Sequence, residues 1–336
     1  MYEGLCLGIE STADDFGVGI VSFDGEILAN VNDVYIPERG GIHPREASRH
    51  HANVAGKVIA EAFKRAGVKP KEISIIAFSQ GPGLGPCLRV GATVARALAS
   101  YLNKPLVGVN HCLAHIEIGR MINRVRDPVT LYVSGGNTIV SAFEAGRYRV
   151  FGETLDIAIG NCLDVFAREA GLRSEPGKPL GAVIEELASR GRRLVPLPYT
   201  VKGMDLSFSG LLTAAVNLLR EGKYPLEDLC FSLQEIAFSM LTEVTERALA
   251  HTEKREVLLT GGVAANKRLQ EMLRVMAEEH DARFSVVPKE YATDNGVMIA
   301  WAGILCYKYG LTTSIERSFV KLKWRLDDVE VPWFEG

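Results

Sequence analysis

Two histidines stand four residues apart in the segment His111-Cys112-Leu113-Ala114-His115. On a helix this spacing puts both imidazoles on one face, one turn apart, where they can bind a single ion. Imidazole nitrogen is a ligand that suits zinc and iron. The other interpretation is a pair of capping or core histidines. Five of the seven histidines fall within residues 42–115, which favours a site, but both interpretations stay open at this point.

Further ligands for such an ion would have to come from distant parts of the sequence. Tyr132 lies just before a glycine-rich turn, and Asp294 is expected at the N-cap of a helix that begins at Asn295. Their alternative roles are a half-buried strand tyrosine and an ordinary helix cap. Peptidase chemistry is disfavoured, because a zincin helix carries a glutamate directly after its first histidine and this chain has Cys112 there.

Four short segments follow expected strands, and three of them are rich in glycine. Residues 134–138 (Ser-Gly-Gly-Asn-Thr) form a turn between two strands, and residues 260–266 (Thr-Gly-Gly-Val-Ala-Ala-Asn) join a strand to a helix, with Asn266 one turn in. Missing side chains at Gly135, Gly136, Gly261 and Gly262 would let backbone N–H groups approach a phosphate. Ordinary turn formation is the alternative for each segment taken alone.

The matching segments of the first half are residues 10–15 (Glu-Ser-Thr-Ala-Asp-Asp) and residues 79–86 (Ser-Gln-Gly-Pro-Gly-Leu-Gly-Pro). The carboxylates of residues 10–15 would repel a phosphate, so this turn suits a metal, a water or a polar part of a substrate. Equivalent loops in two halves would form opposite walls of one cleft.

A repeated order of elements supports that interpretation. Three strands, a helix, a strand and a helix are expected in each half, and the second half carries an all-helical insertion. The expected strands are residues 5–10, 17–23, 26–35, 73–79 and 105–109 in the first half, and residues 129–134, 137–143, 148–154, 256–260 and 283–287 in the second. This is the α/β plan shared by actin, Hsp70 chaperones and sugar kinases (ASKHA).

The chain has 336 residues, more than one hydrophobic core usually supports, so we expect two domains. They are residues 1–125, and residues 126–336 with a helical insertion at about 160–250.

No apolar run reaches the length of a membrane span and the first residues lack a basic leader, which indicates a cytoplasmic protein. Six scattered cysteines without a CxxC pair are expected to be reduced and mostly buried. A net charge of −3 argues against a protein that binds polyanions such as nucleic acids without partner proteins.

Together these motifs resemble the TsaD family, the tRNA N6-adenosine threonylcarbamoyltransferases, once described as O-sialoglycoprotein endopeptidases. The resemblance runs from about Gly8 to Trp301 and is closest to the archaeal and eukaryotic branch, the catalytic subunit of the KEOPS complex. The residues that carry it are Gly8-Ile9-Glu10 with Asp14, residues 41–47 (Gly-Ile-His-Pro-Arg-Glu-Ala), residues 81–84, the His111 and His115 pair, residues 134–138, 208–211 (Phe-Ser-Gly-Leu) and 260–266, and Asp294-Asn295-Gly296.

The resemblance implies one divalent ion, iron or zinc, held by His111, His115 and Asp294, with Tyr132 as a fourth ligand. It also implies contacts to an adenine nucleotide from residues 134–137, Asp164, Gly177 and Asn266. A carboxylate such as Asp164 beside a helix start could accept from ribose hydroxyls; its alternative role is a surface charge. The segment Glu175-Pro176-Gly177-Lys178-Pro179 departs from the usual family pattern, so no acidic nucleotide contact is assigned there.

The activity implied by the family is transfer of a threonylcarbamoyl group from threonylcarbamoyl-AMP to N6 of an anticodon-loop adenosine, in tRNAs that read codons beginning with A. Partners would be the other KEOPS subunits, including a small atypical protein kinase. Asp14 is our candidate for orienting the amine or accepting its proton. Candidate RNA contacts include Lys321, Lys323 and Arg325, although most such charges are simply solvated. A kinase or ATPase of the same fold, and a non-catalytic nucleotide-binding scaffold, are the alternatives.

Overall fold

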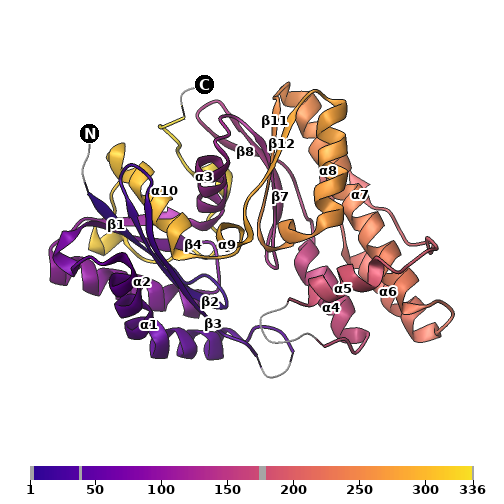
Figure 1. Ribbon diagram of the computed structural model, residues 1–336, viewed down its shortest axis with the longest axis horizontal. Coiled ribbons are helices and arrows are strands. Elements are labelled where there is room, and N and C mark those ends of the chain that lie inside the picture. Colours follow the sequence, from indigo (N-terminus) through magenta and orange to yellow (C-terminus); the bar gives the residue numbers. More distant parts are fainter. Residues whose placement is uncertain (1–3, 38–39, 174–178, 335–336) are drawn as a thin grey trace. The chain divides into compact units, whose positions relative to one another are not determined.

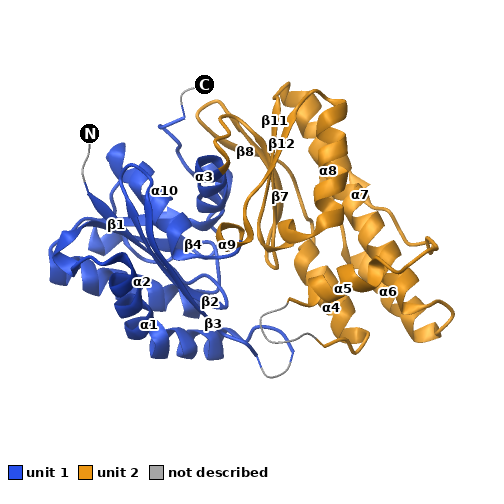
Figure 2. Cartoon of the chain, in the orientation of Figure 1, with its two compact units in different colours: residues 1–122, 293–336 blue, residues 123–292 orange. Residues whose placement is uncertain are grey.

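The computed structural model describes residues 4–37, 40–173 and 179–334. It divides into two compact units, residues 1–122 with 293–336, and residues 123–292 (Figure 2). The first boundary lies close to the predicted one, but residues 293–336 belong to the first unit, whereas the sequence analysis placed them in the second domain. In the described part of the chain, no helix is both long enough and apolar enough to cross a membrane. All six cysteines are buried free thiols, as predicted.

The sheet of unit 1 has five strands in the order β3-β2-β1-β4-β5. β1 pairs antiparallel with β2 and parallel with β4, so the antiparallel and parallel halves meet at β1. The strands are β1 (Leu5–Glu10), β2 (Asp15–Ser22), β3 (Ile27–Val34), β4 (Ile73–Gly81) and β5 (Leu106–Asn110). β1 is apolar along nearly its whole length because helices cover both faces of the sheet.

Alternate residues of β1 face different helices. Leu7 and Ile9 belong to the core formed with α1 (Pro44–Ala66) and α2 (Gly85–Leu102), which lie side by side along one face (Figure 1). Gly8 faces α10 (Gly296–Lys308), because a Cβ on Gly8 would lie 2.3 Å from Ala300 N. Gly19, the partner of Gly8 in β2, is equally close to the start of α10. Helix and sheet therefore pack backbone against backbone here.

The C-terminal segment (residues 311–334) stays with unit 1 after α10. It contains only short 3-10 turns, η3 (Ile315–Arg317) and η4 (Leu326–Asp328). Its backbone bonds to β5 and β4 of the parallel half: Thr313 N donates to Leu106 O at 2.8 Å, and Lys321 N donates to Gln80 O at 2.7 Å. These contacts, together with α10, are the physical reason that the chain's last residues belong to the first unit. A further 3-10 turn, η1 (Pro70–Glu72), precedes β4.

Unit 2 repeats the sheet of unit 1. Its strands are ordered β12-β11-β6-β7-β8, with β6–β7–β8 antiparallel and β11 and β12 parallel to β6. Their bounds are β6 (Val129–Val133), β7 (Thr138–Glu144), β8 (Arg147–Glu153), β11 (Glu256–Thr260) and β12 (Arg283–Val286). The same topology in both units confirms the duplicated α/β plan.

Helices of unit 2 come mostly from the insertion between β8 and β11. α7 packs on β6, β7 and β8, and α8 lies beside it (Figure 1). The elements are α4 (Ile159–Glu169), α5 (Leu180–Ala188), β9 (Val201–Lys202), β10 (Asp205–Leu206), α6 (Ser209–Glu221) and α7 (Leu226–Thr252), followed after β11 by η2 (Gly262–Ala265), α8 (Lys267–Glu279) and the short α9 (Lys289–Ala292). The prediction of an all-helical insertion was wrong, because β9 and β10 form a two-stranded sheet within it. Asp156 fixes the start of α6 by accepting from the backbone N–H groups of Phe208 and Ser209.

Replacing Gly19 by alanine tests the backbone contact between sheet and helix in unit 1. The added Cβ would lie 2.3 Å from Val297 N, so we expect Gly19→Ala to lower the free energy of unfolding by about 1–3 kcal/mol or more. The matched control is Gly56→Ala in α1, where a Cβ meets no atom within 4 Å and where the substitution is expected to stabilise by roughly 0.5–1 kcal/mol. Urea unfolding measures both, and an unchanged Gly19→Ala midpoint would contradict the described packing.

Candidate functional site

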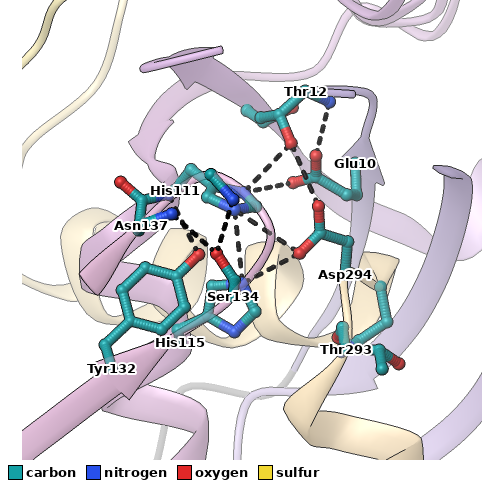
Figure 3. Close-up of polar contacts among 12 residues, drawn as sticks. Glu10, Thr12, His111, His115, Tyr132, Ser134, Asn137, Thr293 and Asp294 are labelled. Carbon is teal, nitrogen blue, oxygen red and sulfur yellow. Dashed lines mark hydrogen bonds and ion pairs between the residues drawn. The ribbon is translucent and has the colours of Figure 1, made fainter. Parts of the chain in front are cut away.

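His111, His115 and Asp294 meet in unit 1 although 179 residues separate the second histidine from the aspartate. The two imidazole Nε2 atoms are 3.2 Å apart, and Asp294 Oδ1 lies 3.0 Å from His115 Nε2 and 3.5 Å from His111 Nε2 (Figure 3). Both histidines are buried, and the side chain of Asp294 is 19% exposed. The sequence prediction that these three residues converge is confirmed.

The elements that carry the cluster explain its position. His111 is the first residue of α3 (His111–Asn123), directly after β5, and Asn110 Oδ1 accepts from Leu113 N at the helix start. Asp294 precedes Asn295, which is the N-cap of α10 and accepts from Met298 N. The prediction that Asp294 itself caps the helix was wrong. Because Asn295 does the capping, the Asp294 carboxylate is available to the histidines.

Glu10 and Thr12 form a second layer behind the cluster, and the sequence analysis assigned no such role to either. Glu10 is fully buried at the end of β1, with Oε2 3.0 Å from His111 Nδ1 and Oε1 accepting from Thr12 N at 2.6 Å (Figure 3). Thr12 Oγ1 donates to Asp294 Oδ2 at 3.3 Å. A carboxylate on the far nitrogen of a ligating histidine fixes the tautomer and the ring orientation.

Carboxylates dominate the electrostatics of this region. Burial disfavours the charged form of His111, but the neighbouring Glu10 and Asp294 carboxylates outweigh it and raise its pKa to about 9. Burial lowers the pKa of His115 despite its bond to Asp294. Burial, together with the charges of Asp294, Asp14 and Glu10, raises the pKa of Asp15 well above its usual range. A region in which acids repel one another in this way is stabilised by a cation.

The donor set fits a divalent metal ion. The candidate ligand atoms of His111, His115 and Asp294 all lie within 4.8 Å of one another, and within the described residues this is the one group of three or more such side chains that does so. Two imidazoles and one carboxylate are a set used by zinc and by non-haem iron. Two ring nitrogens facing each other at 3.2 Å can both act as acceptors only when a cation lies between them.

Tyr132, the predicted fourth ligand, lies in unit 2 near the carboxyl end of β6. It is 1% exposed, and its hydroxyl is 3.4 Å from Asn137 Nδ2. The interpretation of Tyr132 as a half-buried strand residue was wrong about its burial, because the ring is enclosed. Its role as a ligand stays a prediction.

Ser134, Gly135, Gly136 and Asn137 form the tight turn between β6 and β7, as predicted. Ser134 Oγ accepts from Gly136 N at 3.3 Å and from Asn137 N at 3.0 Å. Both glycines are exposed, and a Cβ on either would meet no atom within 4 Å. The turn is therefore open on its glycine side. The start of α4 packs against it, with Gly160 N donating to Ser134 O at 3.2 Å.

Gly261 and Gly262 follow β11, the parallel neighbour of β6, and so lie at the same edge of the sheet as the Ser134 turn. Gly261 has φ +95°, and a Cβ there would lie 2.1 Å from Val133 O, so packing alone requires glycine at this position. Gly262 is exposed and has free space around its Cα. Of these two glycines, packing therefore explains Gly261 but not Gly262.

Asn266 and Asp164 belong to two helices of unit 2, α8 and α4. Asn266 is the N-cap of α8, where its Oδ1 accepts from Arg268 N and Leu269 N and its amide donates to Gln234; its expected place one turn into a helix was wrong. Asp164 lies in the second turn of α4, so its predicted place at the start of a helix was wrong. Burial raises the pKa of Asp164, although Arg168 and a bond from Gly181 N oppose the rise. Gly177 lies outside the described residues.

The first-half turn, residues 10–15, is held from two sides. Leu84 N donates to Thr12 O at 2.8 Å, which ties the loop after β4 to this turn. His51 on α1 is fully buried and its Nε2 lies 3.1 Å from Ala13 O. Asp14 is half-buried in the same turn, and its carbonyl accepts from Tyr35 N at 2.9 Å. The catalytic role of Asp14 stays a prediction.

Comparisons with solved structures confirm the fold. The HypF protein of T. kodakarensis superposes with a TM-score of 0.65 at 16% identity, over 92% of this chain and 48% of that one. An activator of 2-hydroxyisocaproyl-CoA dehydratase from Clostridium difficile gives a TM-score of 0.52 at 13% identity, over 92% of this chain and 96% of that one. At these identities the likeness concerns the fold alone.

Sequence comparisons find relatives that are much more similar to this chain than those solved structures are. A relative from Thermofilum pendens named tRNA N6-adenosine threonylcarbamoyltransferase is 56% identical over 97% of this chain and 96% of its own length. One of the same name from Thermococcus sibiricus is 57% identical over 98% of this chain and its full length. A Methanothermobacter thermautotrophicus relative named "Probable bifunctional tRNA threonylcarbamoyladenosine biosynthesis protein" is 59% identical, and the chain spans 61% of it.

The family model described as tRNA N6-adenosine threonylcarbamoyltransferase (TsaD) matches residues 26–301. The match includes the histidine pair, both glycine turns of unit 2 and Asp294. The chain therefore belongs to the TsaD family and is a transferase that modifies tRNA.

Proposed function

We propose that the chain transfers the threonylcarbamoyl group of threonylcarbamoyl-AMP to N6 of an anticodon-loop adenosine, in tRNAs that read codons beginning with A. The observation that carries the proposal is the cluster of His111, His115 and Asp294 with Glu10 behind it. A kinase or ATPase of this fold has no use for that cluster, and a non-catalytic scaffold has no use for a complete ligand set. Family membership supports the transferase over both.

In this proposal His111, His115 and Asp294 hold one iron or zinc ion, and Tyr132 is its fourth ligand. Bound there, the ion would supply Lewis acidity toward an oxygen of the donor. Glu10 keeps the Nδ1 of His111 protonated, so that Nε2 carries the lone pair that a metal needs. Thr12 holds the second carboxylate oxygen of Asp294 and so fixes the direction of the first.

Unit 2 would hold the AMP part of the donor. The open turn at Gly135 and Gly136, together with the free backbone at Gly262, supports a phosphate contact, because no atom of the described residues lies within 4 Å of a Cβ built on any of these glycines. The start of α4 adds helix N–H groups beside the same turn. Asp164, Gly177 and Asn266 are assigned to the nucleoside part by resemblance to the family.

The donor is already activated, so no covalent enzyme intermediate is required. The adenosine amine attacks the carbamoyl carbon, a C–N bond forms, the bond from that carbon to the AMP phosphate oxygen breaks, and AMP leaves. We assign Asp14 the proton that the amine loses. Holding donor and amine at attack distance is the main contribution of the protein.

We further propose that the chain works as the catalytic subunit of a KEOPS-type complex in the cytoplasm, with a small atypical protein kinase among its partners. The name "bifunctional" of the Methanothermobacter relative supports a second module acting with this one. The net charge of −3 is a further reason to expect that partners contribute basic surface for tRNA.

Replacing His115 tests the metal assignment. We expect His115→Ala to lose the bound ion and to form no threonylcarbamoyladenosine, because two remaining ligands from the chain's first unit hold an ion poorly. Elemental analysis of the purified protein and nucleoside analysis of the tRNA give the two readouts. His280→Ala, which removes a histidine paired with Glu246 on unit 2, is the control and should keep both. Equal metal content in the two variants would reject the assignment.

Replacing Glu10 by glutamine tests the second layer. The carboxylate accepts on both oxygens, from Thr12 N and from His111, whereas an amide accepts on only one. We expect Glu10→Gln to weaken metal binding by about 10- to 100-fold, measured by competition with a chromogenic chelator. The control is Asp33→Asn, which alters the carboxylate that pairs with His50 at 2.9 Å outside the cluster. Wild-type metal affinity in Glu10→Gln would show that Glu10 does not position His111.

Replacing Gly136 tests the nucleotide assignment. A Cβ on residue 136 would meet no atom of the described residues within 4 Å, so a valine side chain there extends into the open space beside the turn. We therefore expect Gly136→Val to weaken binding of AMP at least tenfold while the unfolding midpoint stays unchanged. Calorimetric titration with AMP measures the affinity. Gly56→Val, at a similarly open glycine of α1 in unit 1, is the control and should bind AMP normally. Unchanged AMP affinity in Gly136→Val would count against this turn as the phosphate site.

A further inference from the structure

The C-terminal segment contains a run of residues that the proposed mechanism does not use. Residues 317–325, called here the basic run, hold four cations and no acidic residue, in a chain whose net charge is −3. The four are Arg317, Lys321, Lys323 and Arg325, and all four are exposed. Arg325 pairs with Asp327, but for the other three no carboxylate within the described residues lies in ion-pair range.

The backbone of the basic run is held tightly even though its side chains are exposed. Gln80 Nε2 donates to Arg317 O at 3.2 Å and to Phe319 O at 2.9 Å, and Gln80 O accepts from Lys321 N. Arg96 of α2 donates to Ser318 Oγ at 2.6 Å. The cations therefore project from a fixed backbone, and less conformational entropy is lost when a ligand binds them.

The anchor points of the basic run adjoin the metal cluster. A Cβ on Gly81 would lie 1.9 Å from Lys321 O, and the same loop bonds through Leu84 N to Thr12, which contacts Asp294. At the other end of the run, Asn110 Nδ2 donates to Trp324 O at 3.1 Å, and Asn110 directly precedes His111. All of these contacts lie within unit 1. The run is thus fixed to the end of β4, whose following loop bonds to Thr12, and to the last residue of β5, directly before the first ligand.

Aromatic side chains accompany the cations. Lys321 Nζ lies 3.8 Å from the ring centre of Trp324, and Phe319 is 63% exposed. Cations without carboxylate partners suit phosphates, and an exposed ring beside them offers a stacking surface to an unpaired base. This combination favours single-stranded or looped RNA over an acidic protein partner, which would make less use of an exposed ring.

We propose that the basic run binds the phosphate backbone of the tRNA beside the adenosine that is modified. The proposal rests on the proposed function, since it identifies where the substrate of that same site is held. Arg317, Lys321 and Lys323 are the phosphate contacts, and the protein backbone that presents them keeps the bound RNA near the metal cluster.

The test compares two triple variants of the full chain. Arg317→Gln/Lys321→Gln/Lys323→Gln removes three cations of the basic run, and Lys57→Gln/Lys64→Gln/Lys71→Gln removes three exposed cations from α1 and η1 of the same unit. Fluorescence anisotropy with labelled unmodified tRNA gives the affinity over a series of salt concentrations. Both variants should unfold like the wild type, because backbone atoms and the side chains of Gln80, Arg96 and Asn110 anchor the run.

We expect the basic-run variant to bind tRNA at least tenfold more weakly at low salt. The slope of log affinity against log salt should fall by about 2 to 3, since each lost phosphate contact removes roughly 0.7–0.9. The control variant should keep the wild-type affinity and slope. In a transfer assay the basic-run variant should show a raised KM for tRNA with little change in kcat, and its metal content should be that of the wild type.

Three results would overturn the proposal: wild-type affinity and slope in the basic-run variant, an equal loss in both variants, or no saturable tRNA binding by the wild-type chain at low salt. If the basic-run variant loses affinity only for an acidic partner protein, the run is a protein interface and the RNA assignment is wrong. Failure of the proposed function would look different, because the wild type would then form no threonylcarbamoyl product whatever its affinity for tRNA.

Discussion

The metal cluster depends on how closely the start of α10 approaches the β1–β2 hairpin. Gly8 and Gly19 lie opposite each other in the two strands, and neither leaves room for a Cβ against the backbone of residues 296–300. Asp294 comes two residues before this contact and Glu10 two residues after Gly8. The glycines therefore bring Asp294, a ligand from near residue 300, close to the carboxylate of Glu10, which supports the ligand His111. Larger side chains would push the start of α10 away from the sheet and so move Asp294 away from the histidines.

Unit 2 shows that glycines in one motif can serve different purposes. Gly261 is required by its positive φ and by the carbonyl of Val133, whereas Gly262, Gly135 and Gly136 have open space around them. A fold tolerates a side chain at an open position, so glycine there points to a ligand that comes close to the backbone. This distinction gives the nucleotide assignment of unit 2 a physical basis that the bare sequence motif lacks.

Periodicity and motif spacing were enough to predict the duplicated sheets, the helical insertion and the convergence of His111 with His115. Asp294 was only a candidate ligand on sequence grounds, and its assignment to the metal came from family resemblance, since no local pattern links residue 294 to residue 111. The last 44 residues were assigned to the wrong domain, because a helix that packs on a distant sheet has the same local pattern as one that packs nearby. Glu10 was missed as the partner of His111, although a buried acid at a strand end next to a predicted metal site is a usable signal.

The two units also differ in how their residues are distributed along the sequence. Residues 123–292 form one continuous stretch, whereas the first unit needs residues 293–334 to cover its sheet and to supply Asp294. During synthesis on the ribosome the middle of the chain can therefore collapse to its native form while the first sheet still lacks α10. That sheet would leave a row of glycine backbone exposed until almost the whole chain has emerged. Ribosome stalling before residue 293 would thus leave one face of the first sheet uncovered, whereas the second unit would already have its full sequence.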